Sequence, residues 1–189
     1  MIAVSNLPSK LVEKLTTFDS EVMLTRWELR DIFPHRAHAL VATRALISPW
    51  ESRLILEPKD FGPFLTGHFP GQPVFPMHWM MEMSAEAAGL AALRVMLCEH
   101  PEKVADNRVV LQQSLGIWDR PPLMVNLNHP DGLIVLARYL DVNLEVNKNA
   151  SYTAKTWLYN GKYHSSISEI KARLCSEKSL EKMVVRMSK

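Results

Sequence analysis

The fold is decided by residues 77–98, MHWMMEMSAEAAGLAALRVMLC. This stretch contains no proline and is rich in alanine, methionine and leucine, which favour an α-helix. Because apolar side chains would lie almost all round that helix, we expect it to be buried. Pro76, directly before it, is a favourable residue at a helix start. The sequence therefore predicts a long central helix.

Segments typical of β-strands lie on both sides of this helix. They carry β-branched or alternating apolar residues and cover 38–48, 51–57, 108–117, 123–128, 132–146, 150–159 and 162–174. Asn160 and Gly161, between the last two, are a strong signal for a hairpin turn. Prolines and glycines interrupt residues 58–76, which are predicted to be a loop. The order of elements predicts an α+β fold in which an antiparallel sheet wraps around the helix.

Two shorter helices are predicted upstream. Thr25 and Glu28 form a T-x-x-E capping box at the start of one of them, and Pro34 ends it. Helical spacing is also present within residues 1–24, at Leu11, Val12 and Leu15. We expect residues 1–24 to form an N-terminal extension of the domain.

The composition excludes several classes of protein. Hydrophobic residues make up 47% and charged residues 22% of the 189 residues, which is a globular balance. The net charge of +2 provides no electrostatic footprint for nucleic acid, and no apolar stretch is long enough to span a bilayer. The N-terminus lacks the pattern of a secretory signal. Cys98 and Cys175 form neither a disulfide framework nor a zinc pair, so a reducing, cytoplasmic location is expected.

Two polar features contrast with this apolar background. His68 lies in the tight segment Gly67–Gly71, and Glu82 lies in the buried helix with Glu86 one turn later. A carboxylate in such a helix is costly unless it has a partner or contact with water. The two glutamates could instead mark one solvated stripe of the helix, and His68 could be a loop histidine bonded to backbone. Composition and spacing alone do not decide between these roles.

No motif indicates a cofactor or a metal. The sequence has no G-x-S-x-G elbow, no glycine-rich phosphate loop and no dinucleotide fingerprint. His78 and Glu82 are four residues apart on the helix, a spacing that can bind a metal, but no third ligand is evident. We therefore expect neither a metal nor a cofactor.

The motif around His68 is more specific than its composition. Residues 66–89, TGHFPGQPVFPMHWMMEMSAEAAG, resemble the active-site region of the FabZ-type β-hydroxyacyl-acyl carrier protein dehydratases, which have the hot-dog fold. The family pattern is roughly GHFPGxPxxPGxLxxExxxQ. His68 matches its catalytic histidine and Glu82 its catalytic glutamate, and Phe69 and Gly71 also match.

The resemblance extends beyond this motif. Residues 33–36 look like the P-H-R motif of the family, and residues 159–162 look like its last hairpin. The resemblance implies a hot-dog domain over residues 25–175, with 1–24 as the N-terminal extension and 176–189 as a C-terminal tail.

Two departures from the family pattern lie in the same segment. Met77 replaces the glycine that opens the helix; its N–H can still stabilise an oxyanion, and its side chain is expected to reshape the pocket mouth. Glu86 replaces the usual glutamine. Because like charges one turn apart repel, Glu86 either helps Glu82 to keep its proton or points to solvent. Phe69, Gly71, Met77 and Glu86 are the expected oxyanion- and substrate-binding residues.

The resemblance implies a hydro-lyase. It would convert (3R)-hydroxyacyl thioesters, held on acyl carrier protein through 4′-phosphopantetheine, to trans-2-enoyl thioesters in fatty-acid or specialised lipid or polyketide synthesis. His68 would remove the C2 proton, because histidine titrates near neutral pH. Glu82 would protonate the departing C3 oxygen, which requires a carboxyl group that keeps its proton, as desolvation favours.

The resemblance also implies a homodimer, or an oligomer of dimers, in which His68 of one protomer meets Glu82 of the other. Arg36 and Arg120 are the expected docking residues for the acidic carrier protein. Two other functions are considered, a hot-dog acyl thioesterase and a non-catalytic subunit that binds acyl chains or completes a hetero-dimer.

Overall fold

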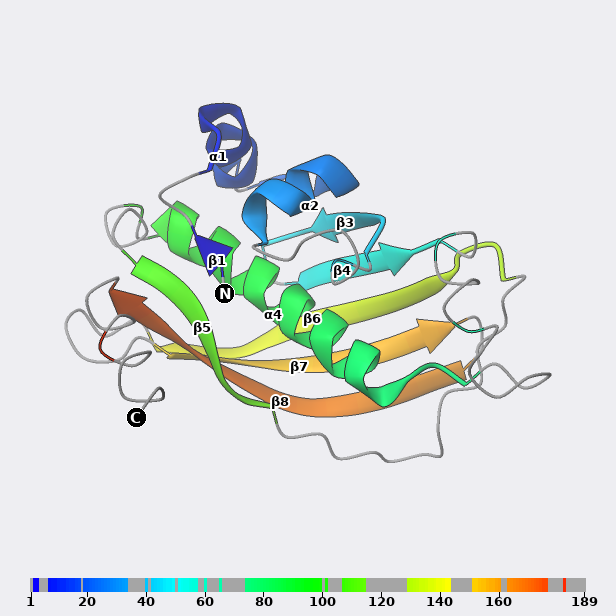
Figure 1. Cartoon of the computed structure of the whole chain (residues 1–189). Helices are drawn as coiled ribbons and strands as arrows, with labels where there is room; N and C mark the ends of the chain where they lie inside the picture. Colours follow the sequence, from blue (N-terminus) through cyan, green and yellow to red (C-terminus); the bar gives the residue numbers. More distant parts are fainter. Residues whose placement is uncertain are drawn as a thin grey trace.

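One antiparallel sheet and a long helix make up most of the described chain (Figure 1). The computed structural model describes residues 2–3, 7–17, 19–33, 40, 42–49, 51–57, 60, 65, 74–99, 101, 107–114, 129–143, 151–160, 163–176 and 182. Within these residues the sheet has eight strands in the order β1-β5-β8-β7-β6-β4-β3-β2. The strands are β1 Ile2–Ala3, β2 Val22–Thr25, β3 Arg44–Ile47, β4 Glu51–Leu56, β5 Asn107–Ser114, β6 Leu133–Asn143, β7 Ser151–Asn160 and β8 Tyr163–Ser176. Each neighbouring pair is antiparallel.

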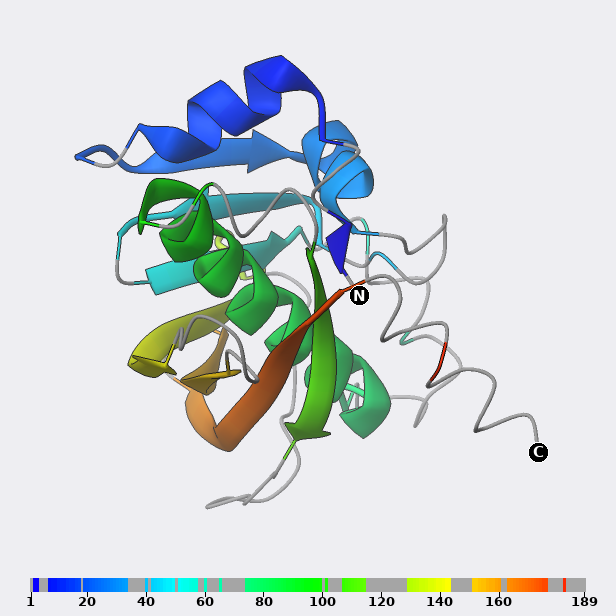
Figure 2. The same ribbon diagram turned by 90° about the vertical axis from the view of Figure 1, so that its left-hand side faces the viewer.

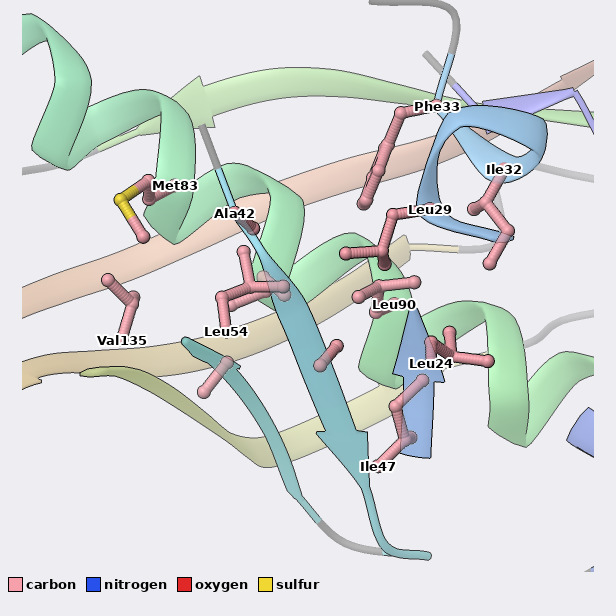
Figure 3. Packing of buried hydrophobic residues seen from close by; sticks show 14 of the residues in the cluster. Leu24, Leu29, Ile32, Phe33, Ala42, Ile47, Leu54, Met83, Leu90 and Val135 are labelled. Carbon is pink, nitrogen blue, oxygen red and sulfur yellow. The ribbon is translucent and has the colours of Figure 1, made fainter. Parts of the chain in front are cut away.

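Helix α4, Met77–Glu99, lies across the inner face of this curved sheet (Figures 1 and 2). Residues 83–97 are buried apart from the half-buried Ala85, so most of the helix is enclosed as predicted. Figure 3 shows the core side chains around it, including Leu24, Leu54, Met83, Leu90 and Val135. Burial of such side chains is the main favourable term in folding. The predicted α+β architecture is confirmed. No helix in the described ranges is long and apolar enough to cross a membrane.

Both predicted N-terminal helices are present. Helix α2, Arg26–Ile32, begins with the predicted capping box: the Glu28 N–H donates to Thr25 Oγ1 (3.4 Å), and the Thr25 N–H donates to Glu28 Oε2 (2.8 Å). Helix α1, Ser9–Thr16, lies beside the C-terminal end of α4 (Figure 1). Its buried leucines belong to the same core cluster as α4, namely Leu11 and Leu15. The N-terminal segment therefore covers part of the core.

The strands differ from the prediction near the N-terminal half. β3 covers only Arg44–Ile47 instead of residues 38–48, since Ala42 and Thr43 are not in a strand. The sequence does not predict β1 or β2, because each is short and pairs with a segment distant in sequence. The predicted strand at residues 123–128 lies outside the described residues.

Two other local predictions are tested by the structure. The predicted hairpin is confirmed, because Asn160 pairs with Tyr163 across β7 and β8; Asn160 itself ends β7, and Gly161 lies outside the described residues. The loop prediction for residues 58–76 is wrong at Asp60 and Leu65, which are helical. Leu65 is buried in the core cluster, so a tertiary contact stabilises helical backbone between the prolines.

A charged cluster lies beside the turn between β3 and β4. Glu51 accepts hydrogen bonds from Arg53 Nε (2.6 Å) and, across the sheet on β6, from Arg138 Nε (2.8 Å). Burial alone would raise the pKa of the Glu51 carboxyl group, but the hydrogen bonds and charges of Arg138 and Arg53 outweigh it and lower the pKa. Glu51 therefore links β4 to β6 as a carboxylate.

We expect Glu51→Gln to destabilise the fold by about 1–2 kcal/mol near neutral pH, because two cations lose a carboxylate partner. A pKa lowered by folding stabilises the native state above the pKa of the unfolded chain. This contribution is lost as the pH falls through the lower, folded value, so the variant and the wild type should converge in acid, below the ordinary titration range of glutamate. Urea unfolding across this range measures the difference. The exposed Glu13→Gln is the control, and a difference independent of pH would contradict the assignment.

Candidate active site

Glu82 lies where α4 passes from exposed to enclosed. His78 and Met81, in the first two turns of the helix, are exposed. Glu82 is half-buried, and residues 83–97 of the helix are buried except at Ala85. The Glu82 carboxyl group therefore lies at the N-terminal end of α4, its open end, directly before the enclosed stretch 83–97. A substrate that reaches this end of α4 can contact the carboxyl group without unfolding the core.

Glu86 lies one turn further along the same face of α4 and is only 2% exposed. This burial shows that the prediction in which Glu86 points to solvent is wrong. It also rules out one solvated stripe through Glu82 and Glu86. A carboxyl group at this depth must be paired or protonated, because an isolated buried charge is very costly. The two glutamates thus differ in environment, one half-buried and one enclosed.

The N-terminus of α4 is next to this carboxyl pair. The Met80 N–H donates to the Pro76 carbonyl oxygen (3.2 Å), which makes Met77 the first residue of the helix. The first N–H groups of a helix have no acceptor within it and point outward from its positive end. The backbone of Met77 is therefore suited to stabilise an oxyanion. Its side chain lies outside the described part of the structure.

The other predicted site residues are not described. His68, Phe69 and Gly71, and the expected docking residues Arg36 and Arg120, lie outside the described residues. The structure thus brings together Glu82, Glu86 and the start of α4 and leaves the position of His68 as a prediction. Among the described side chains, no group of three or more His, Cys, Asp or Glu residues could hold a metal ion.

Comparisons with known proteins agree with this architecture. No model of a known protein family matches the chain. The 3-hydroxyacyl-acyl-carrier-protein dehydratase FabZ of Campylobacter curvus is 29% identical over 160 residues, which are 84% of this chain and 95% of that protein. The FabZ of Campylobacter concisus is 28% identical over the same shares. Among solved structures, a chain of the dehydratase heterocomplex ApeI:P from Xenorhabdus doucetiae has a TM-score of 0.52 at 16% identity, covering 80% of this chain and 93% of that chain.

This chain is a divergent FabZ-like hot-dog protein. The sequence similarity extends over most of the chain, and the structural similarity independently supports the fold. The predicted hot-dog architecture is therefore confirmed.

Two further residues of the FabZ-like chain connect the site helix to its surroundings and are absent from the sequence prediction. Ser52 Oγ donates a hydrogen bond to the carbonyl oxygen of Ala87, in the middle of α4. Arg94, fully buried on α4, donates to the carbonyl oxygens of Ile47, Thr17 and Ser20. The sequence does contain a signal for Arg94. Like Glu82, it is a charged residue inside an otherwise apolar helix. No comparable signal marks Ser52.

Proposed function

We propose that this FabZ-like chain is a hydro-lyase that removes water from (3R)-hydroxyacyl thioesters carried on acyl carrier protein and forms trans-2-enoyl thioesters. One observation carries the proposal: Glu82 is half-buried at the open, N-terminal end of α4, directly before the enclosed stretch 83–97. A carboxyl group at this position can approach a substrate that enters at the N-terminal end of α4 closely enough for proton transfer. The similarity to FabZ dehydratases supports the same chemistry.

The proposed reaction uses one base and one acid. His68 accepts the C2 proton, and the N–H of Met77 stabilises the negative charge that develops on the thioester oxygen. The C2 electron pair then forms the C2=C3 double bond as the C3–O bond breaks. Glu82 donates its proton to the departing oxygen, which leaves as water. The proton held by His68 returns to Glu82 before the next turnover, so both groups regain their starting protonation states. The reaction needs no oxidant or reductant.

The active unit is proposed to be a homodimer, or an oligomer of dimers, in the cytoplasm. His68 of one protomer would meet Glu82 of the other, as the resemblance to the FabZ-type dehydratases implies. Arg36 and Arg120 are proposed to bind the acidic carrier protein, whose 4′-phosphopantetheine arm brings the acyl chain to α4. Opposite charge favours such an encounter and orients the partners. The product would enter fatty-acid or specialised lipid or polyketide synthesis.

A non-catalytic subunit that binds acyl chains or completes a hetero-dimer is the second candidate. Met77 and Glu86 replace the glycine and the glutamine of the FabZ-type pattern. The solved dehydratase from Xenorhabdus doucetiae is itself a heterocomplex. These two observations favour a non-catalytic subunit over an acyl thioesterase as the second candidate.

Mass spectrometry of a 3-hydroxyacyl carrier-protein conjugate separates the candidate functions. Loss of one water with the acyl chain still on the carrier supports the hydro-lyase. A free carrier thiol and a released acid would indicate a thioesterase instead. An unchanged conjugate that still binds the protein would indicate the non-catalytic subunit. His68→Ala and Glu82→Gln, run in parallel, should both leave the conjugate intact.

The buried Glu86 gives a prediction about activity. It lies one turn from Glu82 on the same face of α4 and is only 2% exposed, so its carboxyl group is part of the surroundings of the proposed acid. Glu86→Gln should therefore lower kcat for dehydration, with KM changed much less. The exposed Glu99→Gln, at the far end of α4, should leave kcat unchanged. Wild-type kcat in a folded Glu86→Gln variant would mean that Glu86 does not influence the proposed acid.

A further inference from the structure

The middle of α4 combines small and large buried residues. The small ones are Ala87, Ala88, Gly89, Ala91 and Ala92, and the larger Leu90 and Leu93 lie between and beside them. Burial of apolar surface is non-directional, whereas a hydrogen bond requires a defined distance and angle. The polar contacts of α4 can therefore define where the helix lies along its axis more sharply than the small apolar residues do.

One pair of strand residues contacts α4 at two points. Ile47 of β3 and Ser52 of β4 are paired across the hairpin. Ser52 Oγ donates to the Ala87 carbonyl oxygen, and the Ile47 carbonyl oxygen accepts from Arg94 Nη1. Ala87 and Arg94 are seven residues apart, which is two helical turns and about 10 Å along one face. Sliding or rotating α4 against the sheet would break both hydrogen bonds together.

The other side of the Arg94 guanidinium binds the N-terminal segment. Its Nη2 donates to the carbonyl oxygens of Thr17 and Ser20, each at 2.6 Å. Thr17 is the C-cap of α1, where a cation is favourable because the last carbonyls of a helix carry partial negative charge. Arg94 thus joins α4, the end of β3 and the end of α1. Because it is completely buried, few other conformations can satisfy its donors.

The Cys98 thiol adds a weaker contact at the same junction. Its Sγ lies 3.6 Å from the Leu15 carbonyl oxygen and 3.8 Å from that of Thr16. Burial raises the pKa of this thiol, so it remains an S–H donor at neutral pH. Arg94 and Cys98, on successive turns of α4, therefore both contact carbonyl oxygens at the C-terminal end of α1.

We propose that Arg94 is a positioning residue: with Ser52, it sets the axial position of α4 and hence the positions of Glu82 and Glu86. The consequence for activity rests on the proposed function. Glu86 is adjacent to Ala87, and Glu82 is one turn beyond, so a displacement of the helix moves both carboxyl groups. A misplacement of about 1 Å can cost about a hundredfold in rate.

The test compares Arg94→Met and Arg94→Lys with a core variant of similar stability, Leu24→Ala on β2, at a temperature where all are folded. We expect kcat for the 3-hydroxyacyl carrier-protein conjugate to fall roughly 10- to 100-fold in the Arg94 variants, with KM changed much less. Lysine should not rescue the activity, because one ammonium cannot reach carbonyls on both sides. Leu24→Ala should retain kcat within about threefold. Equal kcat in the Arg94 and Leu24 variants would overturn the proposal.

A second readout does not depend on activity. Amide hydrogen exchange of residues 78–87 should be faster in Arg94→Met than in Leu24→Ala at equal global stability. Equal exchange would also overturn the proposal. If the wild type shows no dehydration, the proposed function fails, and exchange alone decides the role of Arg94. Ser52→Ala, which removes the other contact, replaces Arg94→Met if that variant does not fold.

Discussion

Glu82→Gln should lower kcat for dehydration about 10²–10⁴-fold, because the amide cannot donate a proton to the departing oxygen. Glutamine has nearly the same shape as glutamic acid, and position 82 is half-buried, so the fold should be retained. Substrate affinity should change little, since the lost interaction is made in the transition state. Single-turnover kinetics with a 3-hydroxyacyl carrier-protein conjugate measure the loss.

The matched control is Glu99→Gln on the same helix. Glu99 is exposed at the C-terminal end of α4, remote from Glu82, so this variant should turn over like the wild type. If Glu82→Gln kept full activity in a correctly folded protein, Glu82 would not be the acid. The assignment of the site to the open end of α4 would then be wrong.

A hetero-dimer of His68→Ala and Glu82→Gln chains should regain about half of the wild-type activity, although each variant alone is nearly inactive. In the proposed arrangement each site takes His68 from one chain and Glu82 from the other. The hetero-dimer then contains one site with both residues intact and one with neither. Co-expression with two different tags isolates this species, and its kcat is compared with that of the two parent dimers.

The control is a second hetero-dimer in which both substitutions are on one chain, and it should give the opposite result. A hetero-dimer of the wild-type chain with a His68→Ala/Glu82→Gln chain has no intact shared site and should be inactive. If each site lay within a single protomer, this control would retain about half of the activity and the first hetero-dimer none. The two measurements therefore distinguish shared from separate sites without any structural assumption.

Local sequence signals predict the parts of this fold that depend on local interactions. The capping box at Thr25 and the hairpin after Asn160 need only near neighbours, and both are present. The long apolar run from Met77 predicts α4 because its composition favours a helix and its pattern leaves no solvated face. By contrast, β2 has only four residues and depends on pairing with β3. Such a short segment has no distinctive pattern of its own.

Long-range contacts explain what the sequence does not predict around the site. Arg94 bonds the Thr17 carbonyl oxygen from 77 residues away, and Ser52 bonds Ala87 from 35 residues away. Backbone carbonyls are present at every residue, so no residue type marks the acceptors. Helical periodicity predicts that Glu82 and Glu86 share one face of α4, but it cannot show that one is half-buried and the other enclosed.

The most direct test of the central claim is a crystal structure of the protein with an unreactive amide analogue of a 3-hydroxyacyl pantetheine thioester. We predict one site in which the His68 imidazole contacts C2 and the Glu82 carboxyl group contacts the C3 oxygen, each within about 3.5 Å. The claim would be contradicted if no pairing of subunits brought both side chains to the same bound analogue.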